Sequence, residues 1–137
     1  MNGKTFIDTN VLVYSVDRHS PEKQRRAREI LRTIEREGGG VISTQVVQEF
    51  YVTATRKLGI DPFEAKGLLE PLSALEIVTA DIALIKEAVD CSILNRISFW
   101  DALIVISAEK ARCARLLTED MNAGQTIRGV RIENPFE

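Results

Sequence analysis

Short runs of β-forming residues alternate with helical segments along almost the whole chain, and this alternation limits the folds available to it. The pattern predicts strands at residues 4–7, 41–43, 76–78, 115–118 and 130–133. It predicts helices at residues 10–16, 21–37, 44–57, 81–94 and 98–112, a further helix that begins at 62, and a loop at 122–129. Strands and helices in this order form right-handed crossovers and a parallel sheet with helices on both faces. We therefore expect an α/β fold, in which ligands bind beyond the carboxyl ends of the strands.

The helix boundaries carry clear local signals. Ser20, followed by a proline, and Ser98 are typical N-caps. Asp61 and Glu64 form a D-x-x-E capping box around a proline, and the glycines at 38–40 end the preceding helix. These signals support the helix assignments independently of the hydrophobic pattern.

Size and composition are those of one globular domain. The chain has 137 residues, of which 45% are hydrophobic and 28% charged, so we expect a single domain over residues 1–137. Its formal charge of −2 excludes a strongly basic nucleic-acid binder and leaves only a local patch for such binding. Cys91 and Cys113 show no metal-ligand spacing and are expected to be free buried thiols. Without a signal peptide pattern or an apolar run of ~18–20 residues, we expect a cytoplasmic protein with no membrane contact.

Four acidic residues stand at predicted strand ends or inside apolar helical segments. Asp8 directly follows the first predicted strand, and Asp120 follows the fourth. Glu49 and Asp101 interrupt apolar helical segments, and Asp101 stands in the first turn of a helix whose flanks look buried on all sides. Carboxylates are rarely buried unless they are paired or bound to a metal ion. The carboxyl ends of parallel strands share one edge, so we expect at least Asp8 and Asp120 to lie together.

Each acid also has a purely structural explanation. Asp8 and Asp101 suit helix N-termini, where a carboxylate accepts free N–H groups and complements the helix dipole. Glu49 suits a solvated helix face, and Asp120 suits a turn. These explanations stay open for each residue alone, whereas the shared sheet edge favours one common site.

Carboxylates that converge without a basic partner repel one another unless a cation lies between them. Oxygen ligands without histidine or cysteine select a hard ion, Mg²⁺ or Mn²⁺. Such an ion lowers the pKa of a bound water and offsets the charge of a phosphate. The four acids therefore predict metal-assisted hydrolysis of a phosphodiester bond.

Other chemistries find less support in the sequence. The chain has no G-x-S-x-G, P-loop or G-x-G-x-x-G motif, and its only histidine, His19, is interpreted as a solvated loop residue. Asp8 at a strand end also suits a haloacid dehalogenase-like phosphatase or a receiver domain. In that class a second Asp would stand where this chain has Asn10, and a strand-end lysine is missing. A non-catalytic module that binds RNA or a partner is the other alternative, and the complete acid set disfavours it.

Four sequence blocks together resemble a known family. They are T-F-I-D-T-N-V-L-V-Y from residue 5, Q-E-F-Y-V-T-A-T-R-K from 48, S-F-W-D-A-L-I-V from 98 and L-L-T-E-D from 116. In this order and spacing they resemble a PIN-domain nuclease, most closely the VapC-type toxin ribonucleases of bacterial toxin–antitoxin pairs. The resemblance extends over essentially the whole chain.

The resemblance implies a three-layer α/β/α domain with a five-stranded parallel sheet, and an endoribonuclease that depends on Mg²⁺ or Mn²⁺. It also implies an RNA substrate, a homodimer and a small cognate antitoxin that occupies the cleft. The family's acidic positions fall on Asp8, Glu49, Asp101 and Asp120, with Glu119 as an alternative for the fourth, and supporting hydroxyls fall on Thr9 and Thr118.

Basic side chains offer two candidate RNA contacts. Arg56 and Lys57 lie on the predicted helix that carries Glu49, so they are placed to meet RNA near the acids. A second group of arginines, at residues 25, 28, 32 and 36, forms a stripe on the predicted helix 21–37. Glutamates are interleaved with that stripe, so a solvated, locally paired helix face is the alternative.

Overall fold

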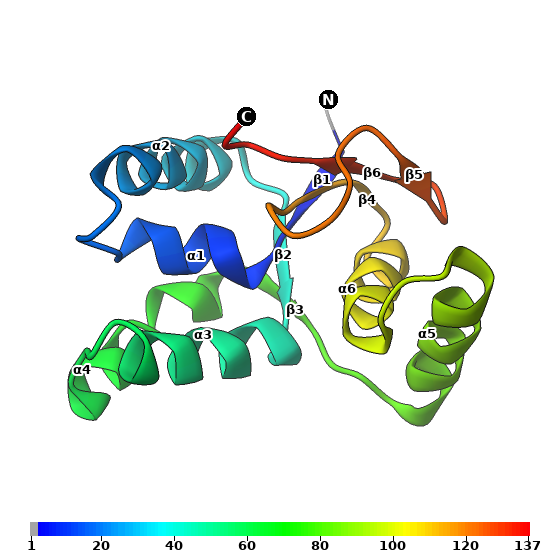
Figure 1. Ribbon diagram of the computed structural model, residues 1–137, viewed down its shortest axis with the longest axis horizontal. Helices are drawn as coiled ribbons and strands as arrows, with labels where there is room; N and C mark the ends of the chain where they lie inside the picture. The colour runs from blue at the N-terminus through cyan, green and yellow to red at the C-terminus, as the bar shows by residue number, and fades with distance from the viewer. Residues whose placement is uncertain (1–2) are drawn as a thin grey trace.

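The structure is a computed structural model that describes residues 3–137 (Figure 1). Its strands are β1 (Lys4–Ile7), β2 (Gly40–Ser43), β3 (Glu76–Val78), β4 (Cys113–Leu117), β5 (Thr126–Ile127) and β6 (Val130–Glu133). Its helices are α1 (Thr9–Ser15), α2 (Pro21–Glu37), α3 (Thr44–Arg56), α4 (Pro62–Gly67), α5 (Ile82–Asn95) and α6 (Phe99–Lys110), with a 3₁₀ turn, η1, at Pro71–Ala74. The predicted elements are all present, with boundaries shifted by a few residues at most.

The strands form one mixed sheet in the order β3-β2-β1-β4-β6-β5. The first five strands of this order run parallel, as predicted, but a sixth strand makes the sheet mixed, so the expected count of five strands is one too low. The two-residue strand β5 is added antiparallel to β6, so the prediction of a loop throughout 122–129 is wrong at this point. Arg128 and Gly129 form the two-residue turn between β5 and β6. Both have positive φ, which is the conformation that a tight hairpin needs.

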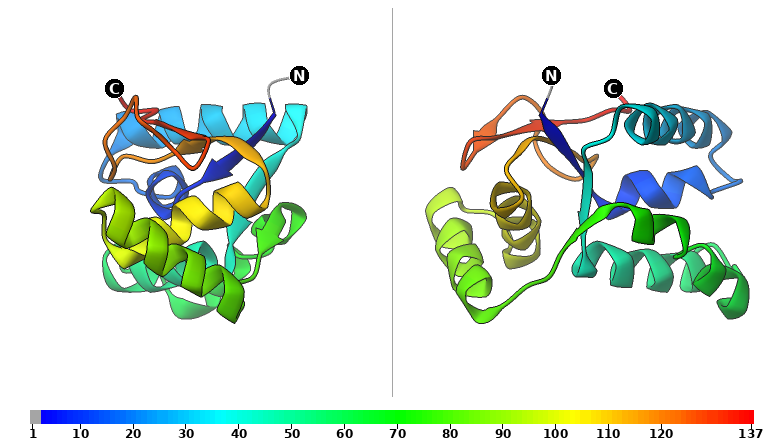
Figure 2. Two further views of the ribbon diagram at one scale, coloured as in Figure 1. Left: turned by 90° about the vertical axis from the view of Figure 1, so that its right-hand side faces the viewer. Right: turned by 180° about the vertical axis from the view of Figure 1, so that it is seen from behind.

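Helices cover both faces of the sheet, which gives three layers (Figures 1 and 2). Helices α1 to α4 lie on one side of the sheet, and α5 and α6 lie on the other. Phe6, Ile7 and Leu116 are fully or almost fully buried between these layers. Val13 of α1 and Phe50 of α3 belong to the same core. The three-layer α/β/α expectation is confirmed.

Capping contacts explain where several helices begin. The Ser98 hydroxyl accepts a hydrogen bond from the Asp101 N–H, and Asp61 accepts from the first N–H groups of α4, as predicted. Ser20 occupies the N-cap position of α2, but its side chain makes no capping hydrogen bond there. Helix α2 ends at Gly38, whose positive φ of 80° favours glycine.

Gly40, the first residue of β2, lies very close to helix α2 and to the end of the 3₁₀ turn. A Cβ atom at Gly40 would stand 2.6 Å from Ile34 Cγ2 and 2.9 Å from Leu75 Cδ2. Glycine at this position therefore lets α2 and the 3₁₀ turn pack directly on the strand.

Cys91 and Cys113 are buried and free, as expected. Burial is the main reason that the pKa of the Cys113 thiol rises to about 12. Among residues 3–137, no single helix has the length and apolar character to cross a membrane. Only α5 and α6 taken together reach that composition, and they are bent by 117° relative to each other.

Candidate active site

The central strands β1 and β4 bring two of the predicted acids to one edge of the sheet. The strands pair in parallel, and the Asp8 N–H donates to the Leu117 carbonyl at 3.0 Å. Asp8 follows β1 and serves as the N-cap of α1, so the capping explanation is correct for this residue as well. Asp120 lies in the loop that follows β4. The sheet edge predicted to carry the chemistry therefore does carry both side chains.

Asp8 is the most buried of the four acids, with 6% of its surface exposed. Its Oδ2 accepts a hydrogen bond from the Thr118 hydroxyl at 2.8 Å, and its Oδ1 accepts from the Thr9 N–H at 2.7 Å. Burial raises the pKa of Asp8 to about 6; the two hydrogen bonds oppose this rise, and the charges of Asp120 and Glu49 add to it. A cation close to Asp8 would therefore stabilise its ionised form.

Helix α3 supplies Glu49 from beside α1. The Thr9 hydroxyl donates to Glu49 Oε1 at 2.8 Å, and Gln45 Nε2 lies 3.4 Å from Glu49 Oε2. Glu49 is half-buried at the wall of a cleft, so it does not lie on an outer, solvated helix face. The predicted role of the Thr9 hydroxyl thus has a structural counterpart in its bond to a second acid.

Asp101 comes from the opposite helical layer, in the first turn of α6. Burial is the largest cause that raises its pKa, and the charges of Asp120 and Glu49 raise it further. The sequence predicts that the residues before and after Asp101 are buried. This is wrong for the residue before it, because Trp100 is 62% exposed. The helix is fully enclosed only after Asp101, which places this acid at the border between core and cleft.

Asp8, Glu49, Asp101 and Asp120 all line one cleft of about 560 Å³. The charges of Glu49 and Asp120 raise the pKa of both Asp8 and Asp101, and within residues 3–137 none of the four acids forms an ion pair with a basic residue. Within residues 3–137, no three His, Cys, Asp or Glu side chains are already arranged as a closed ligand cluster. Repulsion between the like charges keeps the four carboxylates apart.

The donor set fits a hydrated hard cation. Mg²⁺ keeps several of its waters and binds proteins through one or two carboxylates, so it does not require a closed cage of acids. Gln45 adds a neutral acceptor in the cleft wall, because its Oε1 is buried and has no hydrogen-bond partner. An oxygen of this kind suits a water of a hydrated ion or a hydroxyl of a bound ligand.

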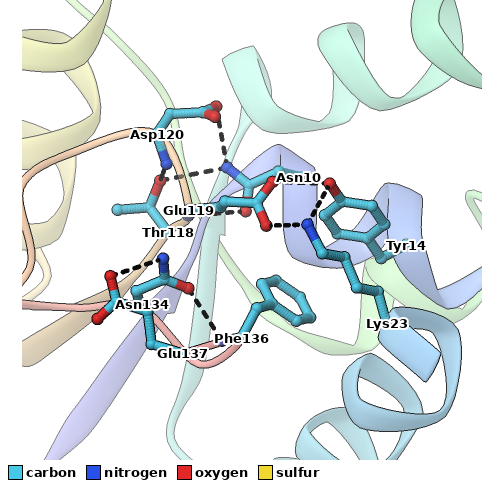
Figure 3. Close-up of polar contacts among 9 residues, drawn as sticks. All are labelled: Asn10, Tyr14, Lys23, Thr118, Glu119, Asp120, Asn134, Phe136 and Glu137. Carbon is cyan, nitrogen blue, oxygen red and sulfur yellow. Dashed lines mark hydrogen bonds and ion pairs between the residues drawn. The ribbon is translucent and has the colours of Figure 1, made fainter. Parts of the chain in front are cut away.

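The structure separates the two neighbouring acids that follow β4 (Figure 3). Asp120 Oδ2 accepts a hydrogen bond from Asn10 Nδ2 at 3.0 Å, and the Asp120 N–H donates to Thr118. Glu119 instead forms an ion pair with Lys23 and accepts a hydrogen bond from the Tyr14 hydroxyl. The geometry therefore favours Asp120 over Glu119 as the fourth acid.

The remaining predicted residues occupy different places. Thr118 is fully buried, and its hydroxyl donates a hydrogen bond to Asp8, but Thr118 does not line the cleft. Lys57 lines the cleft, whereas its exposed neighbour Arg56 is not among the lining residues. Among the described residues that line the cleft, none comes from α2, so the arginine stripe lies elsewhere. His19 is exposed in a loop, as interpreted from the sequence.

Three residues of the site were not identified as such from the sequence. Asn10 bridges the loop after β4 to α1, since its Nδ2 reaches Asp120 and Thr118 and its Oδ1 accepts the Glu119 N–H. Asn10 stands in the D-T-N block that contributes to the family resemblance, but the block alone indicates no contact for its side chain. Tyr14 and Lys23 carry no sequence signal, because their pairing with Glu119 depends on how α2 folds back over α1.

Fold and cleft together define an α/β/α domain with an acidic site at the carboxyl edge of its parallel sheet. The family model described as PIN domain matches residues 5–126. The chain belongs to the PIN domain family, as its four sequence blocks indicated. This membership sets aside the haloacid dehalogenase-like and receiver-domain alternatives.

Solved structures with the same fold include several toxins. A toxin–antitoxin complex from Klebsiella pneumoniae is 20% identical with a TM-score of 0.72, over 98% of this chain and 99% of that one. DNA-bound VapBC from Salmonella typhimurium is 22% identical with a TM-score of 0.69, over 97% and 98% of the two chains. Mycobacterium tuberculosis VapC20, described as a Sarcin-Ricin loop cleaving toxin, is 16% identical with a TM-score of 0.59, over 82% and 87%. At these identities the likeness establishes the fold, and no curated protein matches the sequence.

Proposed function

We propose that this protein is a metal-dependent endoribonuclease and the toxin of a type II toxin–antitoxin pair. The observation that carries the proposal is the cleft lined by four carboxylates, none of which forms an ion pair within residues 3–137. Such a cleft suits a hard cation and, through it, a phosphate group. Membership in the PIN domain family supports a nuclease. The structural likeness to an RNA-cleaving toxin and to toxin–antitoxin complexes supports RNA as the substrate and an antitoxin as the partner.

In this proposal Asp8, Glu49, Asp101 and Asp120 hold Mg²⁺ or Mn²⁺, directly or through bound water. When bound, the cation supplies positive charge against the phosphate and a water of lowered pKa. Thr118 and Thr9 keep Asp8 and Glu49 oriented through their hydroxyl donors at 2.8 Å. With a pKa of about 6, Asp8 is mainly ionised at neutral pH and is available as a ligand.

Substrate binding needs positive charge beside the acids. Lys57 supplies it at the cleft, and the exposed Arg56 continues it along the end of α3. The flat, exposed indole of Trp100 at the opposite wall offers a stacking surface for an unpaired base. We propose further that the chain acts as a single domain, forms a homodimer and works in the cytoplasm.

Cleavage of RNA with and without metal tests this proposal directly. Purified protein is incubated with mixed cellular RNA in Mg²⁺, in Mn²⁺ and in EDTA, and the products are resolved by length. We expect internal cuts with either metal and none in EDTA. Cleavage that persists in EDTA would contradict the metal site. A complete lack of cleavage in both metals, by protein shown to be folded, would favour the non-catalytic alternative.

A further inference from the structure

Tyr14 and Lys23 hold Glu119 from two sides (Figure 3). The Tyr14 hydroxyl donates to Glu119 Oε1 at 2.7 Å, and Lys23 Nζ pairs with Glu119 Oε2. Lys23 Nζ also lies 3.2 Å from the Tyr14 hydroxyl, so the three groups form a closed triangle. Both carboxylate oxygens of Glu119 are therefore occupied by donors that do not belong to the acid group.

The aromatic rings around Lys23 keep this triangle in place. Lys23 Nζ lies 4.7 Å from the centre of the Tyr14 ring and 5.7 Å from that of Phe136. The two rings pack edge to face with their centres 4.9 Å apart. Arg26 Nε donates to the Pro135 carbonyl at 3.0 Å and so ties the same C-terminal turn to α2. The lysine is thus fixed by α1, α2 and the last residues of the chain.

The adjacent residue, Asp120, has the opposite arrangement. Its carboxylate accepts a hydrogen bond from the neutral amide of Asn10 and pairs with no cation in the described part of the chain, and its charge raises the pKa of Asp101. The pKa of Glu119 is lowered: burial alone would raise it, but the hydrogen bonds from Lys23 and Tyr14 favour the charged form. The two neighbouring acids at the rim of the cleft therefore differ: Lys23 neutralises the charge of Glu119, whereas the charge of Asp120 is not neutralised by an ion pair within the described residues.

We propose that Lys23 and Tyr14 are positioning residues that sequester Glu119, so that Asp120 alone supplies the fourth carboxylate of the cleft. Without the lysine, Glu119 would lose its only ion pair among the described residues, one residue from Asp120 and at the rim of the same cleft. It would then compete with Asp120 for the cation and draw it away from the productive position. This inference rests on the proposed metal site and adds a residue-level reason why only one of the two acids serves it.

The test combines removal of the lysine charge with neutralisation of the acid that it holds. Lys23→Met keeps most of the side-chain stem and removes the charge. Because Lys23 is 41% exposed, the variant is expected to fold. We expect Lys23→Met to bind Mn²⁺ several-fold and up to about ten-fold more tightly than wild type by calorimetry, owing to the added free carboxylate. We expect its RNA cleavage rate to fall about ten-fold, and Lys23→Arg to retain both properties.

Addition of Glu119→Gln to Lys23→Met is expected to return Mn²⁺ affinity and cleavage close to wild type. Lys4→Met is the matched control, because Lys4 is 43% exposed and pairs with Glu76 on β3, outside the cleft. It should change neither readout. A double variant no better than Lys23→Met, or Mn²⁺ binding that weakens in Lys23→Met, would overturn the sequestration.

The Mn²⁺ measurements stand without any RNA substrate, so they separate this inference from the proposed function. A wild-type protein that binds Mn²⁺ but cuts no RNA would refute the proposed activity. The pattern of Mn²⁺ affinities among wild type, Lys23→Met and the double variant would still decide whether Glu119 is sequestered. Equal affinities in all three would overturn the inference, whatever the activity.

Discussion

Replacement of Asp8 by asparagine should change how the stability of the metal-free protein depends on pH. The pKa of Asp8 is about 6 in the folded protein, against 3.8 for an ordinary aspartate. The folded state therefore binds this proton more tightly than the unfolded chain. Ionised Asp8 destabilises the fold at neutral pH, and that cost disappears as the pH falls through 6 toward 4.

The size of the effect follows from the two pKa values. At 1.36 kcal/mol for each pKa unit, the full cost of ionised Asp8 is about 3 kcal/mol above pH 7. At pH 4.5 the carboxyl is mostly protonated in the folded protein but still mostly ionised in the unfolded chain. About 2 kcal/mol of the cost present at pH 7.5 is therefore recovered at pH 4.5. Asparagine keeps the shape and cannot ionise. The stability of Asp8→Asn relative to wild type should therefore fall by about 2 kcal/mol over that range.

Urea denaturation in EDTA at several pH values between 4.5 and 7.5 measures this difference. Acids outside the cleft titrate alike in both proteins, so their contributions cancel, as does any constant cost of the amide in its new hydrogen bonds. Asp90→Asn, at an exposed position of α5, is the control and should show no such trend. A stability difference between Asp8→Asn and wild type that stays constant with pH would refute the buried, ionisable Asp8 described above.

Three further predictions concern the acids and the core. Glu49→Gln, Asp101→Asn and Asp120→Asn should each abolish most metal-dependent RNA cleavage, with non-additive losses in combination, whereas cleavage within a few-fold of wild type would remove that residue from the site. In thermal melts, Mg²⁺ at about 100 times its Kd should stabilise wild type by ~2.7 kcal/mol, and Asp101→Asn should lose most of this gain; equal gains would argue against a shared site. Gly40→Ala should lower the free energy of unfolding by about 1–3 kcal/mol in urea, because its Cβ would overlap Ile34 Cγ2 at 2.6 Å, and an unchanged value would show that the layers can separate freely.

The sequence predicts the framework well because the framework depends on local and periodic signals. Apolar runs such as Phe6-Ile7 and Leu116-Leu117 are buried as strands, and caps such as Ser98 begin their helices where expected. Strand β5 escapes prediction because two residues are too short for a periodic pattern. Its position is set by the hairpin turn at Arg128 and Gly129.

The site is predictable only to the extent that fold rules bring residues together. Asp8 and Asp120 follow from the strand-end rule, because both strands end at the same edge. The choice between Asp120 and Glu119 does not follow, since it depends on Lys23, which belongs to another helix far away in the chain. Trp100 shows the same limit: an aromatic beside a buried run looks like core, but the first turn of α6 faces the cleft and leaves it 62% exposed.

The position of β1 in the middle of the sheet has a consequence for the timing of synthesis. Strand β1 pairs on one side with β2 and on the other with β4, which leaves the ribosome only after β2, β3 and helices α1 to α6 have been made. Asp8 therefore meets Asp120 only after β4 and the loop that follows it have emerged, because domains fold as units once their segments are available. The proposed ribonuclease site is thus incomplete, and harmless to the messenger and the ribosome, until β4 and the loop after it have been made.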